Sequence, residues 1–206
     1  MKSIRRQFKL KLDIKDFNDA GLLEILGASF VANEPAIFGT PDEDYIAKEL
    51  KWYNSKSLNI LDMIDPPKIW YKCASDEGYI NSNYGWCIFS EDNGSQYEHV
   101  VTKLKTNSST KRACMIYTRP TMHTDAIKDG INDFICTNAV TYKITNGSID
   151  AIVQMRSNDA VYGYKNDYAW QNHVLGRLAK DLNVAKGKIY WQTASLHIYP
   201  RHFGLI

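Results

Sequence analysis

The chain has 206 residues, of which 44% are hydrophobic and 23% are charged, and its formal net charge is +2. This composition excludes a disordered or fibrous chain, and the length predicts one domain over residues 1–206. The net charge is too small to indicate a direct nucleic-acid partner. The locally basic residues 2–11 are therefore interpreted as a solvated face.

The chain carries four cysteines, and no two of them form a C-x-x-C pair. In a chain of this length they are expected to be reduced thiols. No apolar run approaches the ~18 residues of a membrane span. The segment FKLKLDI, which follows the basic start, lacks the apolar region of a signal peptide. We therefore expect a cytoplasmic protein with no membrane partner.

Strand-like and helix-like segments alternate along the chain. The first predicted strand is followed by helices that each begin with an acidic residue, then by three strands, a third helix and a last strand. In chain order these segments are Leu22–Val31, helix Asp42–Asn54, helix Asp92–Lys105, Arg112–Thr118, Phe134–Ile144, Ile149–Arg156, helix Asp167–Leu182 and Lys188–Tyr199; polar residues 106–110 predict an exposed loop. The fold class is α/β (α+β), with one mixed central sheet flanked by helices.

Asn146-Gly147 separates two apolar segments and predicts a two-residue hairpin turn, because both central residues of a type I′ turn need positive φ. This turn pairs Ile144 with Ile149. Counting outward, Cys136 falls opposite Ser157, and Arg156 points to the other face of the sheet. Joint use of Cys136 and Arg156 would therefore require a β-bulge or a strand end nearby.

Three residues stand out from their surroundings. Cys136 lies in DFICTN; a buried thiol is the ordinary outcome, but an arginine nearby would lower its pKa and favour a nucleophile. Glu49 shares the apolar face of its helix, so it either reaches solvent at the edge of that face or is buried as a proton-transfer group. Asp167 begins a predicted helix, where a capping role is the simpler interpretation.

The sequence gives little support for a metal site or for a nucleotide-binding motif. His197 and His202 lie in HIYPRH without a cysteine or acidic partner at ligand spacing, so no metal is predicted. Neither G-x-G-x-x-G nor G-x-x-x-x-G-K-[ST] occurs, which removes the dinucleotide and phosphate-loop motifs.

Taken together, several segments resemble the thymidylate synthase family, and most closely its branch from T-even-type bacteriophages that hydroxymethylates deoxycytidylate. The resemblance covers about residues 23–203, and it rests on the order and spacing of GASFVANEPAIFG, ELKWY, INSNYGW, KRACMIYTRP, DFICTN, MRSNDAVYGYKNDYAWQ and SLHIYPRHF. It implies a thymidylate synthase-like homodimer, in the host cytoplasm if the gene is carried by a phage.

The resemblance also implies roles for individual residues. Cys136 would be the nucleophile, Glu49 would manage protons and water, and Asp167 would read the pyrimidine edge. The remaining roles are binding roles: Arg156 and Ser157 for the phosphate, Lys111 and Arg112 for the same phosphate from the other subunit, His197 and Tyr199 for the deoxyribose hydroxyl, and Asp159 and Trp86 for the folate.

Asp167 replaces the asparagine with which thymidylate synthases read uracil. A carboxyl group can accept from the exocyclic amine of cytosine and share a proton with ring nitrogen 3, so the exchange favours cytosine. The implied reaction transfers a one-carbon unit from 5,10-methylenetetrahydrofolate to carbon 5 of dCMP. Water rather than hydride completes it, giving 5-hydroxymethyl-dCMP and tetrahydrofolate. Thr137-Asn138 stands where synthases carry a histidine, which is consistent with that difference.

Two departures from the family pattern leave alternatives open. Lys111-Arg112 replaces a double arginine, and the sequence stops at Ile206, where family members continue with a segment that closes over the folate. A deoxyuridylate-directed member, either a thymidylate synthase or a dUMP hydroxymethylase, is the alternative enzyme. A catalytically weak scaffold in a phage nucleotide-synthesis assembly is the alternative from another class.

Overall fold

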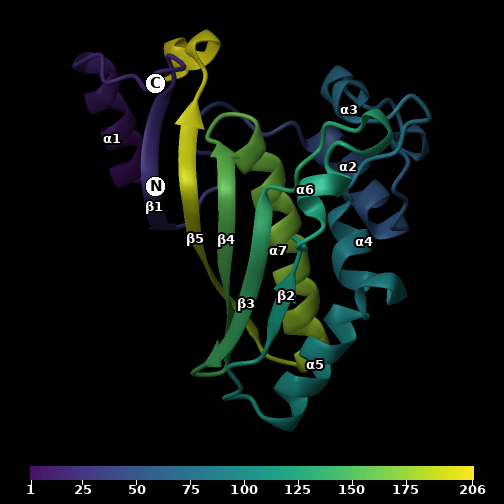
Figure 1. Ribbon diagram of the computed structural model, residues 1–206. Coiled ribbons are helices and arrows are strands. Elements are labelled where there is room, and N and C mark those ends of the chain that lie inside the picture. Colours follow the sequence, from purple (N-terminus) through teal and green to yellow (C-terminus); the bar gives the residue numbers. More distant parts are fainter.

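A five-stranded mixed sheet forms the centre of the fold (Figure 1). The computed structural model describes residues 1–206. The strands lie in the order β1-β5-β4-β3-β2, and only β4 and β5 are parallel. Their bounds are β1 Leu23–Val31, β2 Cys114–Ile116, β3 Thr137–Thr145, β4 Ser148–Asp159 and β5 Ala185–Ile198. The predicted mixed sheet is thereby confirmed.

The helices lie mainly behind this sheet and beside its β2 edge (Figure 1). The long helix α7 crosses behind β4 and β5, because two consecutive parallel strands need a crossover connection. The face turned toward the viewer in Figure 1 carries no helix. The helices are α1 Lys2–Asp13, α2 Glu43–Ser55, α3 Lys68–Cys73, α4 Tyr84–Phe89, α5 Gln96–Thr106, α6 Met122–Asp125 and α7 Gly163–Leu182.

Several predicted boundaries change in the structure. The second predicted helix is interrupted at Gly94 and Ser95, whose φ values of 74° and 47° are left-handed, so α5 begins only at Gln96. Helix α7 begins at Gly163, which places Asp167 inside the helix; the capping interpretation of Asp167 was wrong. Helix α1 escaped prediction because its sequence is mostly polar and it buries little of itself.

The hairpin between β3 and β4 has the predicted register at its turn, where Ile144 pairs with Ile149. A β-bulge between Thr137 and Ala139 then shifts the pairing by one residue. The backbone N–H of Arg156 donates to the carbonyl oxygen of Cys136 at 2.9 Å. Cys136 therefore lies opposite Arg156; the ideal-ladder position opposite Ser157 was wrong, and the required bulge is present.

Aromatic side chains join the helices that approach the start of β3. The ring of Tyr53 in α2 stacks on Tyr84 in α4 at 5.3 Å and meets Trp170 in α7 edge-on at 5.1 Å. All three side chains are buried. Offset-stacked and edge-to-face geometries are the favourable ones for aromatic pairs, so this cluster fixes α2 against α4 and α7.

Gly85 permits the close approach of α4 to α2. A Cβ at this position would lie 1.7 Å from the carbonyl oxygen of Tyr53, a contact that backbone atoms cannot accommodate without moving apart. We expect Gly85→Ala to lower the free energy of unfolding by about 1–3 kcal/mol or more. Urea denaturation measures the change.

Gly176→Ala is the matched control for that experiment. Its Cβ would meet nothing closer than the Lys186 side chain at 4.0 Å, and alanine is the better helix former. This control should be neutral or stabilising. Equal effects of the two substitutions would show that the α2–α4 contact does not limit stability.

Candidate active site

Cys136 and Arg156 meet where β3 begins. The Arg156 guanidinium lies 3.6 Å from the Cys136 sulfur, as a joint role requires. The same guanidinium donates from Nε to the carbonyl oxygen of Ile135 at 2.9 Å, and it lies 4.8 Å over the ring of Phe134. Arg156 therefore holds the segment that carries the thiol as well as the thiol itself.

The Cys136 thiol is not activated in the free protein. Burial, with a smaller contribution from the Asp167 carboxyl group, raises the pKa of Cys136 to about 11, and Arg156 offsets only part of this increase. The expected neighbouring arginine is present and lowers the pKa of the thiol as expected, but the effect of burial is larger. Cys136 is therefore protonated at neutral pH until a ligand changes its surroundings.

Glu49 points into the protein from α2, a helix whose start is capped by the Asp42 side chain accepting from the Tyr45 backbone N–H at 3.0 Å. Glu49 is only 4% exposed, so the edge-of-face alternative was wrong. The Tyr45 hydroxyl donates to Glu49 at 2.6 Å, and the Trp70 indole N–H donates to Tyr45 at 3.0 Å. Burial raises the pKa of Glu49 to about 8, against the lowering effect of the Tyr45 hydrogen bond.

Asp167 faces the same interior from α7. Its carboxylate accepts a hydrogen bond from the Asn158 side-chain amide of β4 at 2.7 Å. Burial raises the pKa of Asp167 to about 7, while hydrogen bonds from Tyr84 and Asn158 lower it. Asp167 and Glu49 are close enough for the charge of Asp167 to raise the pKa of Glu49. Two acidic groups that titrate near neutrality therefore share one site with a thiol.

Sequence reasoning named Glu49, Cys136 and Asp167 but missed three neighbours that set their chemistry. Tyr45 had a signal, since it lies one helical turn before Glu49. Tyr84 and Asn158 had none, because they approach Asp167 from α4 and β4 only in the folded chain.

Asp159, His197 and Tyr199 gather at the carboxyl ends of β4 and β5. Asp159 pairs with His197 across the parallel strands, and the rings of His197 and Tyr199 meet edge-on at 5.2 Å. Nδ1 of His197 lies 3.4 Å from the Ser195 hydroxyl, which donates to Glu24. Burial lowers the pKa of His197, so its imidazole is neutral at neutral pH.

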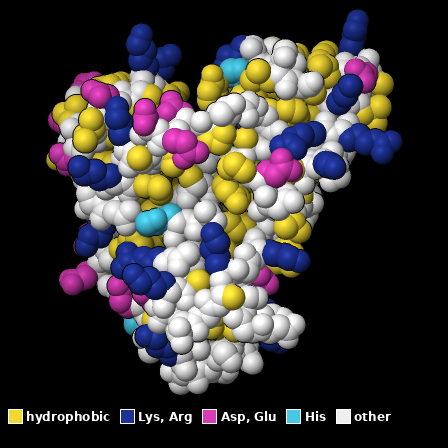
Figure 2. Space-filling view, turned by 180° about the vertical axis from the view of Figure 1, so that it is seen from behind, with side chains coloured by type: hydrophobic (Ala, Val, Ile, Leu, Met, Phe, Trp, Pro, Cys, Tyr) yellow, Lys and Arg dark blue, Asp and Glu magenta, His cyan; other side chains and the backbone are white.

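The space-filling view from behind shows a notch at the top of the molecule, between the part that carries α3 and the part that carries α1 and the carboxyl-terminal end (Figure 2). Hydrophobic side chains gather along this notch (Figure 2). The carboxyl ends of β4 and β5 point toward the same end of the molecule (Figure 1). A ligand can therefore approach Asp159 and the start of α7 from this side.

Four predicted site residues lie apart from the contacts around the thiol. Lys111 and Arg112 are exposed in the loop before β2. Because Cys114 pairs with Thr141, Lys111 and Arg112 extend toward the hairpin end of β3. At the rise per residue of a β-strand, this places them roughly 20 Å from Cys136.

Trp86 donates from its indole to Asp92 at 3.3 Å and lies under Arg119. Ser157 follows Arg156 but makes no side-chain hydrogen bond within the chain.

Comparisons with known proteins identify the family of the chain and its relatives. The thymidylate synthase family matches residues 43–206. The deoxycytidylate 5-hydroxymethyltransferases of Enterobacteria phages T4 and T2 are 50% identical to the chain over 218 residues, covering 100% of it and 89% of their own length. The deoxyuridylate hydroxymethyltransferase of Bacillus phage SP01 is 29% identical over 142 residues, covering 63% of the chain and 37% of that protein.

Solved structures show the same fold. The thymidylate synthase of T4 phage superposes with a TM-score of 0.73 and 17% identity, covering 95% of this chain and 78% of that one. Thymidylate synthase A from Bacillus subtilis gives a TM-score of 0.69 and 20% identity, covering 89% and 68%.

The raised carboxyl pKa values predict how stability depends on pH. In the unfolded chain, Glu49 and Asp167 ionise near 4.5 and 3.8, whereas in the fold their pKa values are about 8 and about 7. The folded state therefore binds more protons across this window, and the free energy of unfolding should fall as pH rises from about 4.5 to about 8. Glu49→Gln should reduce this slope by up to ~1.4 kcal/mol per pH unit, measured by urea denaturation.

Glu43→Gln is the control for the Glu49 substitution. Glu43 is exposed in the first turn of the same helix, so its replacement should leave the slope unchanged. A slope that is equally steep in Glu49→Gln and in the unaltered protein would contradict the raised pKa of Glu49.

Proposed function

The chain belongs to the thymidylate synthase family, and from that premise we propose that it is a deoxycytidylate 5-hydroxymethyltransferase. The proposed reaction transfers a one-carbon unit from 5,10-methylenetetrahydrofolate to carbon 5 of dCMP and adds water. The observation that carries this proposal is the juxtaposition of a thiol, Cys136, with the buried carboxyl group of Glu49 and the partly buried one of Asp167. The 50% identity to phage enzymes of this name supports it along the whole chain.

Asp167 is proposed to read the pyrimidine edge. A carboxyl group whose pKa is about 7 exchanges its proton readily at neutral pH. It can therefore accept from the exocyclic amine of cytosine while sharing a proton with ring nitrogen 3. The Asn158 amide fixes the orientation of the carboxyl group through its 2.7 Å hydrogen bond.

Cys136 is proposed to add as a thiolate to carbon 6 of the ring, which makes carbon 5 nucleophilic. Because burial keeps this thiol protonated in the free protein, its proton must leave in the substrate complex. Arg156, 3.6 Å from the sulfur, stabilises the thiolate that results.

Glu49 is proposed to handle the protons that carbon 5 and the added water gain or lose. A general acid or base works best when its pKa lies near the working pH, and burial brings Glu49 to about 8. The Tyr45 hydroxyl holds the carboxyl group in place. Glu49 can therefore act in either protonation state without leaving its position.

The nucleotide phosphate and sugar are assigned to residues around this centre. Arg156 and Ser157 are proposed to hold the phosphate, and Lys111 and Arg112 to reach it from a second subunit. The deoxyribose hydroxyl is assigned to His197 and Tyr199. The neutral state of His197 supports this assignment, because a neutral imidazole has one nitrogen free to accept from a hydroxyl.

The residues present fit a folate co-substrate. Trp70 is partly exposed and lies beside Glu49 through its hydrogen bond to Tyr45, which provides an aromatic surface for a planar ring. Asp159 is proposed to contact the folate. Trp86 is a second proposed folate contact. When bound, methylenetetrahydrofolate supplies the one-carbon unit.

Product analysis tests the proposed reaction. After incubation with methylenetetrahydrofolate and either dCMP or dUMP, mass spectrometry should show 5-hydroxymethyl-dCMP as the main product. Cys136→Ser should abolish turnover while nucleotide binding persists, because a hydroxyl is a far weaker nucleophile at neutral pH. Exchange of the carbon-5 hydrogen of dCMP with solvent should also be lost. If product formed only from dUMP, dUMP and not dCMP would be the substrate. If the Cys136→Ser variant still exchanged the carbon-5 hydrogen at the unaltered rate, Cys136 would not be the nucleophile.

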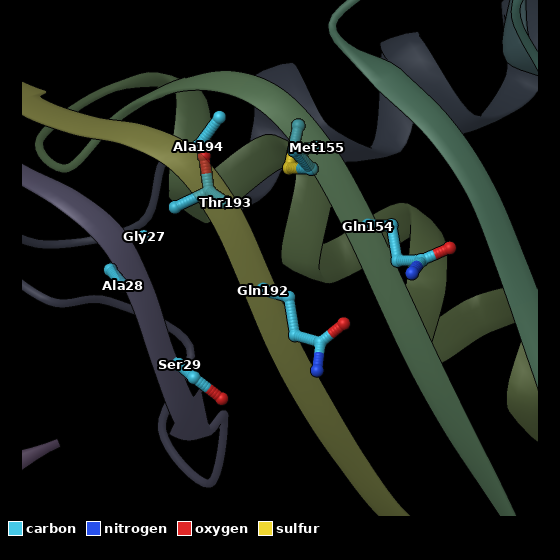
Figure 3. A pocket seen from close by; sticks show the side chains of 8 residues that line it. All are labelled: Gly27, Ala28, Ser29, Gln154, Met155, Gln192, Thr193 and Ala194. Carbon is cyan, nitrogen blue, oxygen red and sulfur yellow. The ribbon is translucent and has the colours of Figure 1, made fainter.

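A homodimer through the uncovered face of the sheet is also proposed. This face exposes apolar side chains, since Val31 pairs with Tyr190 across β1 and β5 and they are 38% and 37% exposed. Figure 3 shows the side chains that line a hollow on β1, β4 and β5, among them Gln154 from β4 and Gln192 from β5. Exposed apolar surface of this kind is typical of an interface.

Subunit mixing tests whether the phosphate site is shared across such a dimer. Arg112→Ala and Cys136→Ala should each be inactive alone, and mixed subunits should regain activity because one hybrid site keeps both residues. The recovered activity approaches a quarter of the unaltered level, since about half the dimers are hybrids with one intact site of two. Mass spectrometry verifies that subunits exchange. Exchange without recovery would contradict a shared site.

A further inference from the structure

Asn158 carries a polar atom that the fold leaves without a partner. The side chain is only 3% exposed, and its Nδ2 donates to Oδ2 of Asp167 at 2.7 Å. Its carbonyl oxygen, Oδ1, is buried and accepts no hydrogen bond. Buried acceptors are nearly always satisfied, so an orphan beside a functional carboxyl group points to a ligand that supplies a donor.

The orientation of this amide is fixed by chemistry. An ionised Asp167 carboxylate only accepts hydrogen bonds, so the amide must turn its nitrogen toward Asp167 and its oxygen away. Rotation of the Asn158 amide by half a turn would place two acceptors against each other. When Asp167 is ionised, the position next to it therefore presents an acceptor.

Gly163 keeps the space beside this pair open. A Cβ at this position would lie 3.4 Å from Nδ2 of Asn158 and 3.7 Å from Oδ2 of Asp167. A longer side chain would crowd the two groups, so glycine at the first residue of α7 limits crowding beside the amide and the carboxyl group.

The protonated form of Asp167 can present more than one hydrogen-bond pattern to a pyrimidine. Because burial raises the pKa of Asp167 to about 7, this form is accessible at neutral pH. That form has one donor and one acceptor, and it can pair with the cytosine edge or, by placing its proton on the other oxygen, with the uracil edge. A neighbouring group with fixed polarity is needed to separate the two substrates.

We propose that Asn158 is a specificity-determining residue whose Oδ1 accepts a hydrogen bond from the 4-amino group of a cytosine ring that faces Asp167. This inference rests on the proposed function and adds Asn158 to Asp167 as a second side chain that recognises the cytosine ring. The amino group of cytosine has two hydrogens, one for Asp167 and one for Asn158. Uracil would bring its carbonyl oxygen to the same place, where two acceptors repel each other.

Specificity ratios test the inference. The ratio of kcat/KM for dCMP to kcat/KM for dUMP is measured for the unaltered enzyme, Asn158→Ala and Asn158→Asp. Asn158→Ala removes the acceptor, and the ratio should fall about tenfold or more, with most of the loss in dCMP. Asn158→Asp is nearly isosteric and keeps an oxygen in place by sharing a proton with Asp167, so its ratio should stay within about threefold of the unaltered enzyme.

Asn172→Ala is the matched control, because Asn172 lies on α7 and bonds only to Lys186 at 3.0 Å. Its ratio should not change. An equal loss for both nucleotides in Asn158→Ala would mean that Asn158 only supports the structure, and it would overturn the proposal. If Asn158→Ala does not fold, loss of dCMP preference in Asn158→Asp would overturn it equally.

The same measurements separate this inference from the function on which it rests. An unaltered enzyme that does not hydroxymethylate dCMP contradicts the proposed function, whatever the Asn158 variants do. An unaltered enzyme that prefers dCMP, together with an Asn158→Ala variant that keeps the preference, contradicts the role of Asn158 alone.

Discussion

Desolvation of ionisable groups around one thiol is the constraint on which the site depends. Burial raises the pKa values of Glu49 and Asp167 to about 8 and about 7, and that of Cys136 to about 11. Each group is held by a neutral or cationic donor, namely Tyr45, Asn158 or Arg156. Glu49 and Cys136 are therefore mostly uncharged at neutral pH and Asp167 titrates there, which reduces the cost of buried charge and leaves protons available for transfer.

The fold delivers these groups through local departures from regular structure. The bulge at the start of β3 places Cys136 opposite Arg156, and Gly85 lets α4 approach α2 closely enough for Tyr84 to stack on Tyr53. A regular ladder would have turned the thiol and the guanidinium to opposite faces. Such features weaken the local sheet or crowd the backbone, so their presence beside the candidate site indicates that geometry is maintained there at some expense of stability.

The sheet divides the molecule into two functional faces. Helices α2, α4 and α7 enclose the carboxyl groups on one side, while the other side exposes Tyr190 and Val31 on strands that carry no helix (Figure 1). Lys111 and Arg112 lie far along the sheet from Cys136, so the proposed phosphate contact requires that they act on a neighbouring subunit. In the proposed dimer, one face of the sheet supports the catalytic site and the other face contacts the second subunit.

The sequence by itself determined the mixed fold class, the hairpin register at Asn146-Gly147, the place of Glu49 on the apolar face of its helix and the need for a bulge near Cys136, because these follow from periodicity and turn geometry within short segments. Only the tertiary structure decided the features that depend on contacts between segments far apart in the sequence. Whether burial or Arg156 controls the pKa of Cys136 depends on how deeply the fold encloses the thiol, and burial prevails. The pairing of Asn158 with Asp167 joins a strand to a helix, and the orphaned oxygen of that amide exists only because the surrounding fold excludes water from it.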